Sequence, residues 1–248
     1  CSIALIAAGF ATAGEIQDAS GGGSSAILVE ADKLFSGGQY AEACRINVKH
    51  AKHGNAETWE RVGRCYEEGT GTPKNLKEAF HWYRESALQG NSDAENKVGE
   101  MLLVGEGTHV NIPGAATLFE RAAKKGHPDA QYHLGFLYKT GMGVRKNPEA
   151  AFDLFKASAE SGNLPAQYAL AKAYDAGEGI SADQTEAINW YRQAADAGHG
   201  GAQYELALKY FQGAGVAQDI ALAKVLLRRS EDQGVAEAKE LLKKIEAW

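Results

Sequence analysis

The sequence has 248 residues, of which 44% are hydrophobic and 23% are charged, and its formal net charge is -6 at pH 7. This composition predicts a folded, soluble chain, and the acidic balance argues against nucleic acid or an anionic membrane as a partner. No uninterrupted apolar run approaches the ~20 residues that a bilayer-spanning helix needs, so we expect no transmembrane span.

The first 25 residues differ in kind from the rest of the chain. They carry no charge before Glu15, and they contain an apolar run from Ile3 to Phe10 followed by Ala-Thr-Ala at 11–13. This pattern is typical of the hydrophobic core and cleavage site of a secretory signal peptide, so residues 1–13 are predicted to be the remnant of one. Residues 14–25 include Ser-Gly-Gly-Gly-Ser-Ser and are predicted to be a flexible linker.

Two other interpretations of this segment stay open. Cys1 could be the lipid-bearing residue of a mature lipoprotein, although an apolar segment follows it where a polar tether is usual. The segment could also be the N-terminus of a cytoplasmic protein. The signal-peptide and lipoprotein interpretations both predict an exported protein, either periplasmic or secreted.

Residues 26–57 are expected to form a first helix pair that caps the N-terminal end of the fold. After this pair the chain is expected to turn near Gly54. Cys44 before the turn and Cys65 after it lie about equally far from it, so they should face each other in an antiparallel hairpin. In an oxidising compartment they would form a disulfide. The alternative is two free, buried cysteines too far apart to bond, since Cα atoms more than ~7 Å apart cannot be bridged.

From residue 58 the sequence repeats with a period of 36 residues, which four columns share. The columns are Gly90, Gly126, Gly162, Gly198 and Gly234; the pairs Gly69/Gly71, Gly105/Gly107, Gly141/Gly143, Gly177/Gly179 and Gly213/Gly215; Ala79, Ala115, Ala151, Ala187 and Ala223; and Ala94, Ala130, Ala166, Ala202 and Ala238. Columns that keep one register predict a stack of similar units.

Each unit is predicted to contain two helices. The first, such as residues 130–140, carries apolar residues at helical spacing and ends at the glycine pair, because Gly takes positive φ without steric cost. The second begins after a residue that accepts hydrogen bonds from the free N–H groups of the helix. These predicted N-caps are Asn75, Asn111, Asn147, Asp183 and Asp219.

The pattern AxxxLGxxYxxGxGVxxDxxxAxxWYxxAAxxG resembles the Sel1-like repeat, a relative of the tetratricopeptide repeat. The resemblance covers residues 58–248 as five repeats and a C-terminal capping helix, while residues 26–57 look more like a plain tetratricopeptide unit. It implies an all-α, right-handed solenoid of helix-turn-helix repeats. It also implies a non-catalytic adaptor that binds another protein, and we expect it to act as a monomer in the bacterial cell envelope.

Two alternative functions remain at this point. Some secreted, cysteine-rich relatives have been linked to β-lactam binding or hydrolysis, but the paired cysteines that recur in their repeats are missing here. An envelope-polysaccharide binding module would need an exposed row of aromatic residues, whereas Tyr132, Tyr168 and Tyr204 are interpreted as packing residues because they fall in a repeat column.

Motifs for catalysis or cofactors are not found in the sequence. The repeated GxG does not extend to a phosphate-binding or dinucleotide-binding loop, and zinc and nucleophile signatures are absent. His50 and His53 lie three residues apart on one predicted helix, but no third ligand accompanies them, so a solvated pair is expected. We therefore predict no enzyme activity, no metal and no cofactor.

The candidate binding surface lies opposite the packing residues of the first helix in each unit. Because a helix turns 100° per residue, Ala130, Leu134 and Tyr138 centre on one side and position 136 marks the other, with 133 beside it. In related superhelices that side lines a concave groove. The candidate residues are Arg61, Arg64, Lys97, Glu100, His133, Phe136, Lys172 and Leu208.

These positions change character from repeat to repeat, unlike the core columns. Phe136 and Leu208 are apolar where solvent is expected, and Arg61, Arg64 and Lys97 are predicted to make the early end of the groove basic. The hypothesis is a partner segment with an apolar anchor and an acidic flank, since buried aromatic and Arg contacts commonly dominate binding. An ordinary solvated face with two incidental apolar residues is the alternative.

Overall fold

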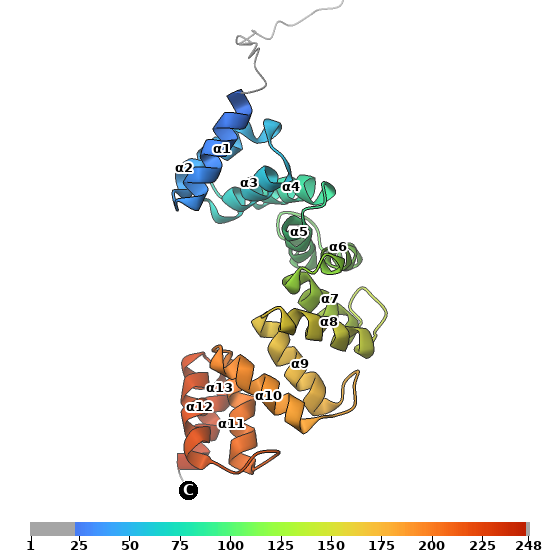
Figure 1. Cartoon of the computed structure of the whole chain (residues 1–248), viewed down its shortest axis with the longest axis vertical. Coiled ribbons are helices and arrows are strands. Elements are labelled where there is room, and N and C mark those ends of the chain that lie inside the picture. The colour runs from blue at the N-terminus through green and yellow to red at the C-terminus, as the bar shows by residue number, and fades with distance from the viewer. Residues whose placement is uncertain (1–22, 247–248) are drawn as a thin grey trace, which may run out of the picture.

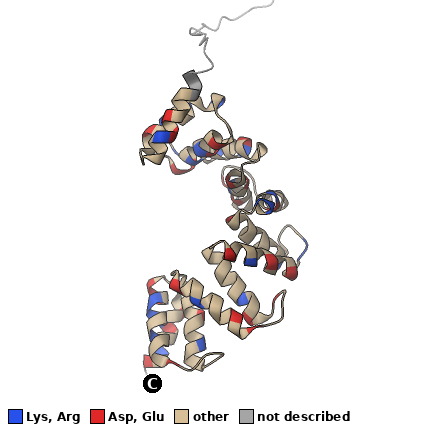
Figure 2. Ribbon diagram, viewed as in Figure 1, with Lys and Arg blue, Asp and Glu red and all other residues tan. Residues whose placement is uncertain are grey.

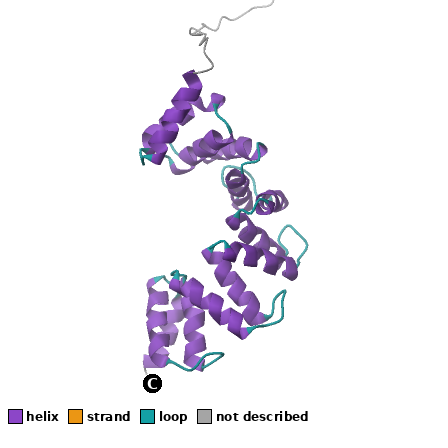
Figure 3. Ribbon diagram, viewed as in Figure 1, coloured by secondary structure: helices purple, strands orange, loops and turns teal. Residues whose placement is uncertain are grey.

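The computed structural model describes residues 23–246, which form thirteen α-helices, one short 3-10 helix and no strand (Figure 3). The helices are α1 (Gly23–Ser36), α2 (Tyr40–His50), η1 (Ala51–His53), α3 (Ala56–Glu68), α4 (Leu76–Leu88), α5 (Ser92–Val104), α6 (Ile112–Lys124), α7 (Pro128–Thr140), α8 (Pro148–Glu160), α9 (Leu164–Ala176), α10 (Gln184–Asp196), α11 (Gly200–Gln212), α12 (Ile220–Asp232) and α13 (Ala236–Glu246). The predicted all-α solenoid is confirmed.

Successive helices pack against each other along the chain, from α1 on α2 to α12 on α13. The result is an elongated, curved array in which the α1–α2 end and the α11–α13 end lie on the same side (Figure 1). The ten helices from α3 to α12 are each 13 residues long, because the period places a start and a stop signal at the same two positions in every repeat.

The predicted N-caps of the even-numbered helices are confirmed. Asn75, Asn111, Asn147, Asp183 and Asp219 each accept a hydrogen bond from a backbone N–H in the first turn. The predicted stop is confirmed too: Gly141, which ends α7, has φ +78, and the equivalent glycines end α3, α5, α9 and α11 in the same left-handed conformation.

The caps of the odd-numbered helices were not predicted. Asn55, Asn91 and Asn163 cap α3, α5 and α9, while the Nδ1 atoms of His127 and His199 accept from the backbone N–H groups of Ala130 and Ala202. These two histidines are therefore the N-caps of α7 and α11.

A disulfide joins the N-terminal helix pair to the first repeat. Cys44 in α2 and Cys65 in α3 are bonded, with Cα atoms 5.7 Å apart, and both side chains are buried. Helix α1 begins at Gly23, so the last three residues assigned to the linker are helical. The rest of the linker, the signal-peptide remnant at 1–13 and the lipid-bearing role of Cys1 lie outside the described residues.

Candidate partner-binding face

The candidate groove residues all come from odd-numbered helices. Arg61 and Arg64 lie on α3, Lys97 and Glu100 on α5, His133 and Phe136 on α7, Lys172 on α9, and Leu208 on α11. All eight are partly or largely exposed. We call the surface that they share on α3, α5, α7, α9 and α11 the odd-helix face.

The α3 end of the odd-helix face is not the free basic patch that the sequence predicted. Arg61 pairs with Asp32 of α1, and Arg64 pairs with Glu60 at 2.7 Å. Both guanidinium groups also lie over the ring of Phe35, at 5.6 and 5.5 Å from its centre. Each positive charge is thus matched by a carboxylate.

The same neutralisation continues on α5. Lys97 lies 3.3 Å from Glu67 of α3 and 3.4 Å from Glu100, and Glu100 contacts His133 of α7 at 3.2 Å. Burial acts to raise the pKa of Glu100, but the hydrogen bond with His133 and the charge of Lys97 outweigh it, so that pKa is lowered. Positive and negative residues are interspersed along the array (Figure 2).

An apolar hollow interrupts this charged face between α7 and α9. Its volume is about 170 Å³, and we call it the aromatic hollow. It is lined by Tyr132, Phe136, Lys139, Phe155, Pro165, Tyr168, Ala169, Lys172 and His199. Phe136 is 44% exposed here, so a large apolar ring faces solvent in the middle of the array. The structure thus brings together Phe136 and Lys172 from the predicted set.

Tyr168 is held in place at the wall of the aromatic hollow. Its ring stacks on the imidazole of His199 with the centroids 4.4 Å apart, and the Lys172 ammonium lies 5.7 Å from its centre. Burial raises the pKa of Tyr168 to about 12, and burial lowers the pKa of His199 below its ordinary value of 6.5. At neutral pH, therefore, Tyr168 keeps its proton and His199 is uncharged.

The two lysines of the aromatic hollow differ in how firmly they are paired. The Lys139 ammonium lies 2.6 Å from a carboxylate oxygen of Glu178, whereas Lys172 lies 3.7 Å from Glu205. Lys172 is therefore the more available of the two for a negative group.

Sequence reasoning missed the role of the tyrosine column. Tyr132 and Tyr168 do pack, as expected, but they also line the hollow, and Tyr204 lines a second hollow beside Leu241 and Lys244 of α13. The signal was the recurrence of Tyr at one position in three successive repeats. Leu208 is partly buried and lines neither hollow.

The most perturbed titratable groups sit in the core. Tyr83 and Tyr191 are fully buried, and burial followed by their carboxylate neighbours raises the pKa of each. Tyr83 donates to Glu67 at 2.6 Å and Tyr191 to Asp175 at 3.4 Å. Perturbed pKa values often mark active sites, but these hydroxyls are closed off from any substrate, so they are packing groups.

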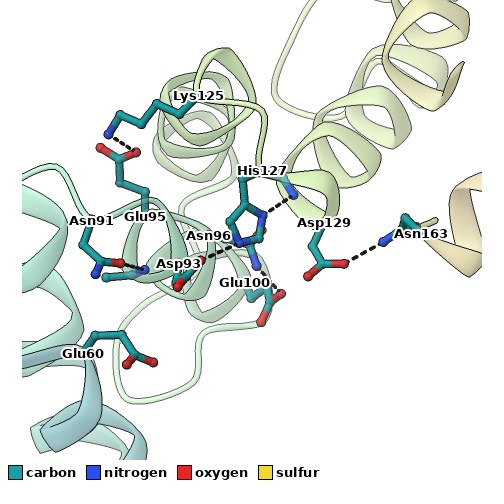
Figure 4. Close-up of polar contacts among 12 residues, drawn as sticks. Glu60, Asn91, Asp93, Glu95, Asn96, Glu100, Lys125, His127, Asp129 and Asn163 are labelled. Carbon is teal, nitrogen blue, oxygen red and sulfur yellow. Dashed lines mark hydrogen bonds and ion pairs between the residues drawn. The ribbon is translucent and has the colours of Figure 1, made fainter. Parts of the chain in front are cut away.

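Polar contacts between neighbouring helices explain further charged residues (Figure 4). Glu95 is fully buried in α5 and pairs with Arg121 of α6 at 2.7 Å and with Lys125, the residue that follows α6, at 2.8 Å. His127 contacts Asp93 at 3.2 Å while capping α7, and Asn163 donates to Asp129 at 2.6 Å. These groups have local partners and join neighbouring helices.

The histidine pair considered in the sequence is not on one helix. His50 ends α2 and His53 ends the 3-10 helix η1, because the α-helical hydrogen bonding breaks at His50. Within residues 23–246 no group of three or more His, Cys, Asp or Glu side chains is arranged to hold a metal ion. None of the helices in that range is long and apolar enough to cross a bilayer.

Comparison with known proteins identifies the repeats. The family model of the Sel1 repeat matches five consecutive segments, residues 60–91, 92–127, 128–163, 164–199 and 201–235. No curated protein matches the chain in sequence.

Three solved structures with the same architecture come from bacteria. A Sel1 repeat protein from Oxalobacter formigenes is 28% identical with a TM-score of 0.81, over 88% of this chain and 87% of that chain. The protective antigen c5321 of uropathogenic Escherichia coli, which displays an SLR fold, is 28% identical with a TM-score of 0.69, over 90% of this chain and 56% of that chain. The immunity protein Pa5087 of Pseudomonas aeruginosa shares the fold at 19% identity and a TM-score of 0.50, over 84% of this chain and 81% of that chain.

Proposed function

Since the chain belongs to the Sel1 repeat family, we propose that it is a monomeric, non-catalytic scaffold that holds a segment of another protein on its odd-helix face. Sel1 repeats generally serve protein–protein interaction. The observation that carries the proposal is Phe136, a large ring that is 44% exposed within a hollow at the centre of the array. Exposed aromatic groups in a recess commonly anchor a partner.

We further propose that the chain is exported to the bacterial envelope. The bond between Cys44 and Cys65 supports this location, because disulfides form and persist in oxidising compartments. The description of the related E. coli protein as a protective antigen agrees with export.

Site-specific photo-crosslinking in the native host tests the scaffold proposal. A benzophenone amino acid replaces Phe136 in one variant and Lys156 in a control, because Lys156 is exposed on the even-numbered helix α8 and does not line the aromatic hollow. We expect a discrete crosslinked protein from position 136 and none from position 156. Equal crosslinking from both positions, or nitrocefin turnover by the purified protein, would contradict the proposal.

A further inference from the structure

We infer that the aromatic hollow takes a single aromatic or branched apolar side chain from an extended partner segment, and that Lys172 binds an acidic residue next to that side chain. This inference rests on the proposed function and specifies the partner's chemistry. It places the recognition between α7 and α9 and away from the α3 end of the odd-helix face.

The size of the hollow limits what can enter it. Its volume of about 170 Å³ is below the ~300–1,000 Å³ of pockets that enclose a whole small molecule. One side chain of a partner segment fits this space, while the rest of the segment lies over the surface. The walls for that side chain are aromatic, with the rings of Tyr132 and Phe155 6.0 Å apart, centroid to centroid, and Phe136 beside them.

The charges around the hollow favour an acidic neighbour. Two lysines line it, and none of its lining residues is a carboxylate, although the chain as a whole is acidic. On the odd-helix face, Arg64, Lys97 and Lys139 are paired at 2.6–3.4 Å. Among the described residues, the one ion pair of Lys172 is the 3.7 Å contact with Glu205, and its side chain is 46% exposed. An incoming carboxylate can therefore bind Lys172 without breaking a close ion pair.

The same walls make a sugar a poorer occupant. A sugar ring stacks on an open aromatic face and needs hydrogen-bonding partners for its hydroxyls. Tyr168 is already stacked on His199, and no Asn, Gln, Asp or Glu lines the hollow. A peptide side chain needs only the apolar contact and one charge, which this hollow provides.

Three peptides, acetylated and amidated so that they carry no terminal charges, and one oligosaccharide test the inference by amide NMR titration of the full chain. The acidic peptide is Gly-Ser-Gly-Asp-Phe-Asp-Gly-Ser-Gly, the basic peptide has Lys in place of both Asp residues, and a third has Ala in place of Phe. A chito-oligosaccharide is the fourth probe. We expect the acidic Phe peptide to shift the amides of Phe136, Ala169 and Lys172, and to bind about fivefold or more tightly than the basic peptide.

Three variants separate the anchor from the charge. Ala169→Leu fills the hollow with the residue that α13 carries at the equivalent position, Leu241, so it should fold normally and weaken the acidic peptide about tenfold. Lys172→Glu should reverse the preference towards the basic peptide. Lys156→Glu on α8 makes the same charge change away from the hollow and should leave the preference unchanged.

Several results would overturn the inference. These are no binding of the acidic peptide, shifts that centre elsewhere, an unchanged preference in Lys172→Glu, or the oligosaccharide shifting the hollow in place of the peptide. The proposed function is tested separately, because a protein crosslinked through position 136 supports the scaffold whichever peptide preference is found.

Discussion

Replacing Gly179 by Ala should loosen the joint between two repeats. Gly179 has φ +76, and a Cβ atom there would overlap the carbonyl oxygen of Pro148, at the start of α8 in the preceding repeat, and lie 2.6 Å from its carbon. Gly162 provides a matched control: it has φ +87 at the turn between α8 and α9, but a Cβ atom there would meet nothing within 4 Å. Both substitutions strain the backbone, and only one also creates a clash.

The difference between the two variants measures the inter-repeat contact. The left-handed conformation costs an L-residue about 1–2 kcal/mol at either position. At Gly179 the backbone of α8 must also move, and overpacking of this kind costs about 1–3 kcal/mol. We therefore expect Gly179→Ala to lower the free energy of unfolding by about 2–5 kcal/mol and Gly162→Ala by about 1–2 kcal/mol.

Urea unfolding followed by circular dichroism provides the measurement. Repeat arrays unfold through coupled neighbouring units, so the midpoints and slopes are compared within a nearest-neighbour model rather than as a single transition. Gly179→Ala should also lower the cooperativity between the repeats on either side of it. If both variants shift the midpoint equally, Gly179 has no packing role against α8 and the reasoning is wrong.

Three further changes should alter stability for separate reasons. Reducing the Cys44–Cys65 bond, which closes a separation of 21 residues, should cost about 3 kcal/mol in thermal melts, and an unchanged melt would contradict its role as a clamp. Ala151→Leu should cost about 1–3 kcal/mol by overpacking a buried helix crossing, and a melt without loss would count against that crossing. The depressed pKa of Glu100 means that its ion pairs are intact above its ordinary pKa of 4.5 and are lost as the pH falls through the lower folded value. Glu100→Gln should therefore be less stable than the parent at pH 7, with the gap closing below about pH 4.5, and a gap independent of pH would refute the assignment.

The repeat period was enough to predict the helices because their signals are local. An Asn or Asp that accepts from N–H groups two or three residues later, and a glycine that takes positive φ, act within one turn of the helix. The caps formed by His127 and His199 were missed because His is not a usual cap, although the column they share with Asn55, Asn91 and Asn163 could have shown it.

The predicted basic end failed because carboxylates on the same helix and on neighbouring helices pair with its cations. A helical wheel of α3 shows Arg61 and Arg64 on an open side, but it does not show that Asp32 of α1 pairs with Arg61. Nor does it show that Glu67 of α3 pairs with Lys97 in the next repeat. Charges on one helix therefore do not give the charge of a surface that several helices build.

Compensation between neighbouring helices explains the buried Glu95. At its position in later repeats, Gln131, Gln167 and Gln203 donate to the carbonyl oxygen eight residues earlier. Glu95 cannot donate when ionised, and Arg121 instead donates to the equivalent carbonyl of Ala87 at 3.2 Å while pairing with Glu95. The departure at Glu95 is thus matched by Arg121 on the second helix of the same repeat.

The aromatic hollow also depends on residues from more than one helix. Phe136 and Lys172 occupy one column in neighbouring repeats, and only the packing of α7 and α9 against α8 places them around one recess. In such an array the unit of recognition is a pair of adjacent repeats. A variable column should therefore be read as a series of neighbouring pairs, in which Phe136 followed by Lys172 specifies an apolar anchor beside a negative charge.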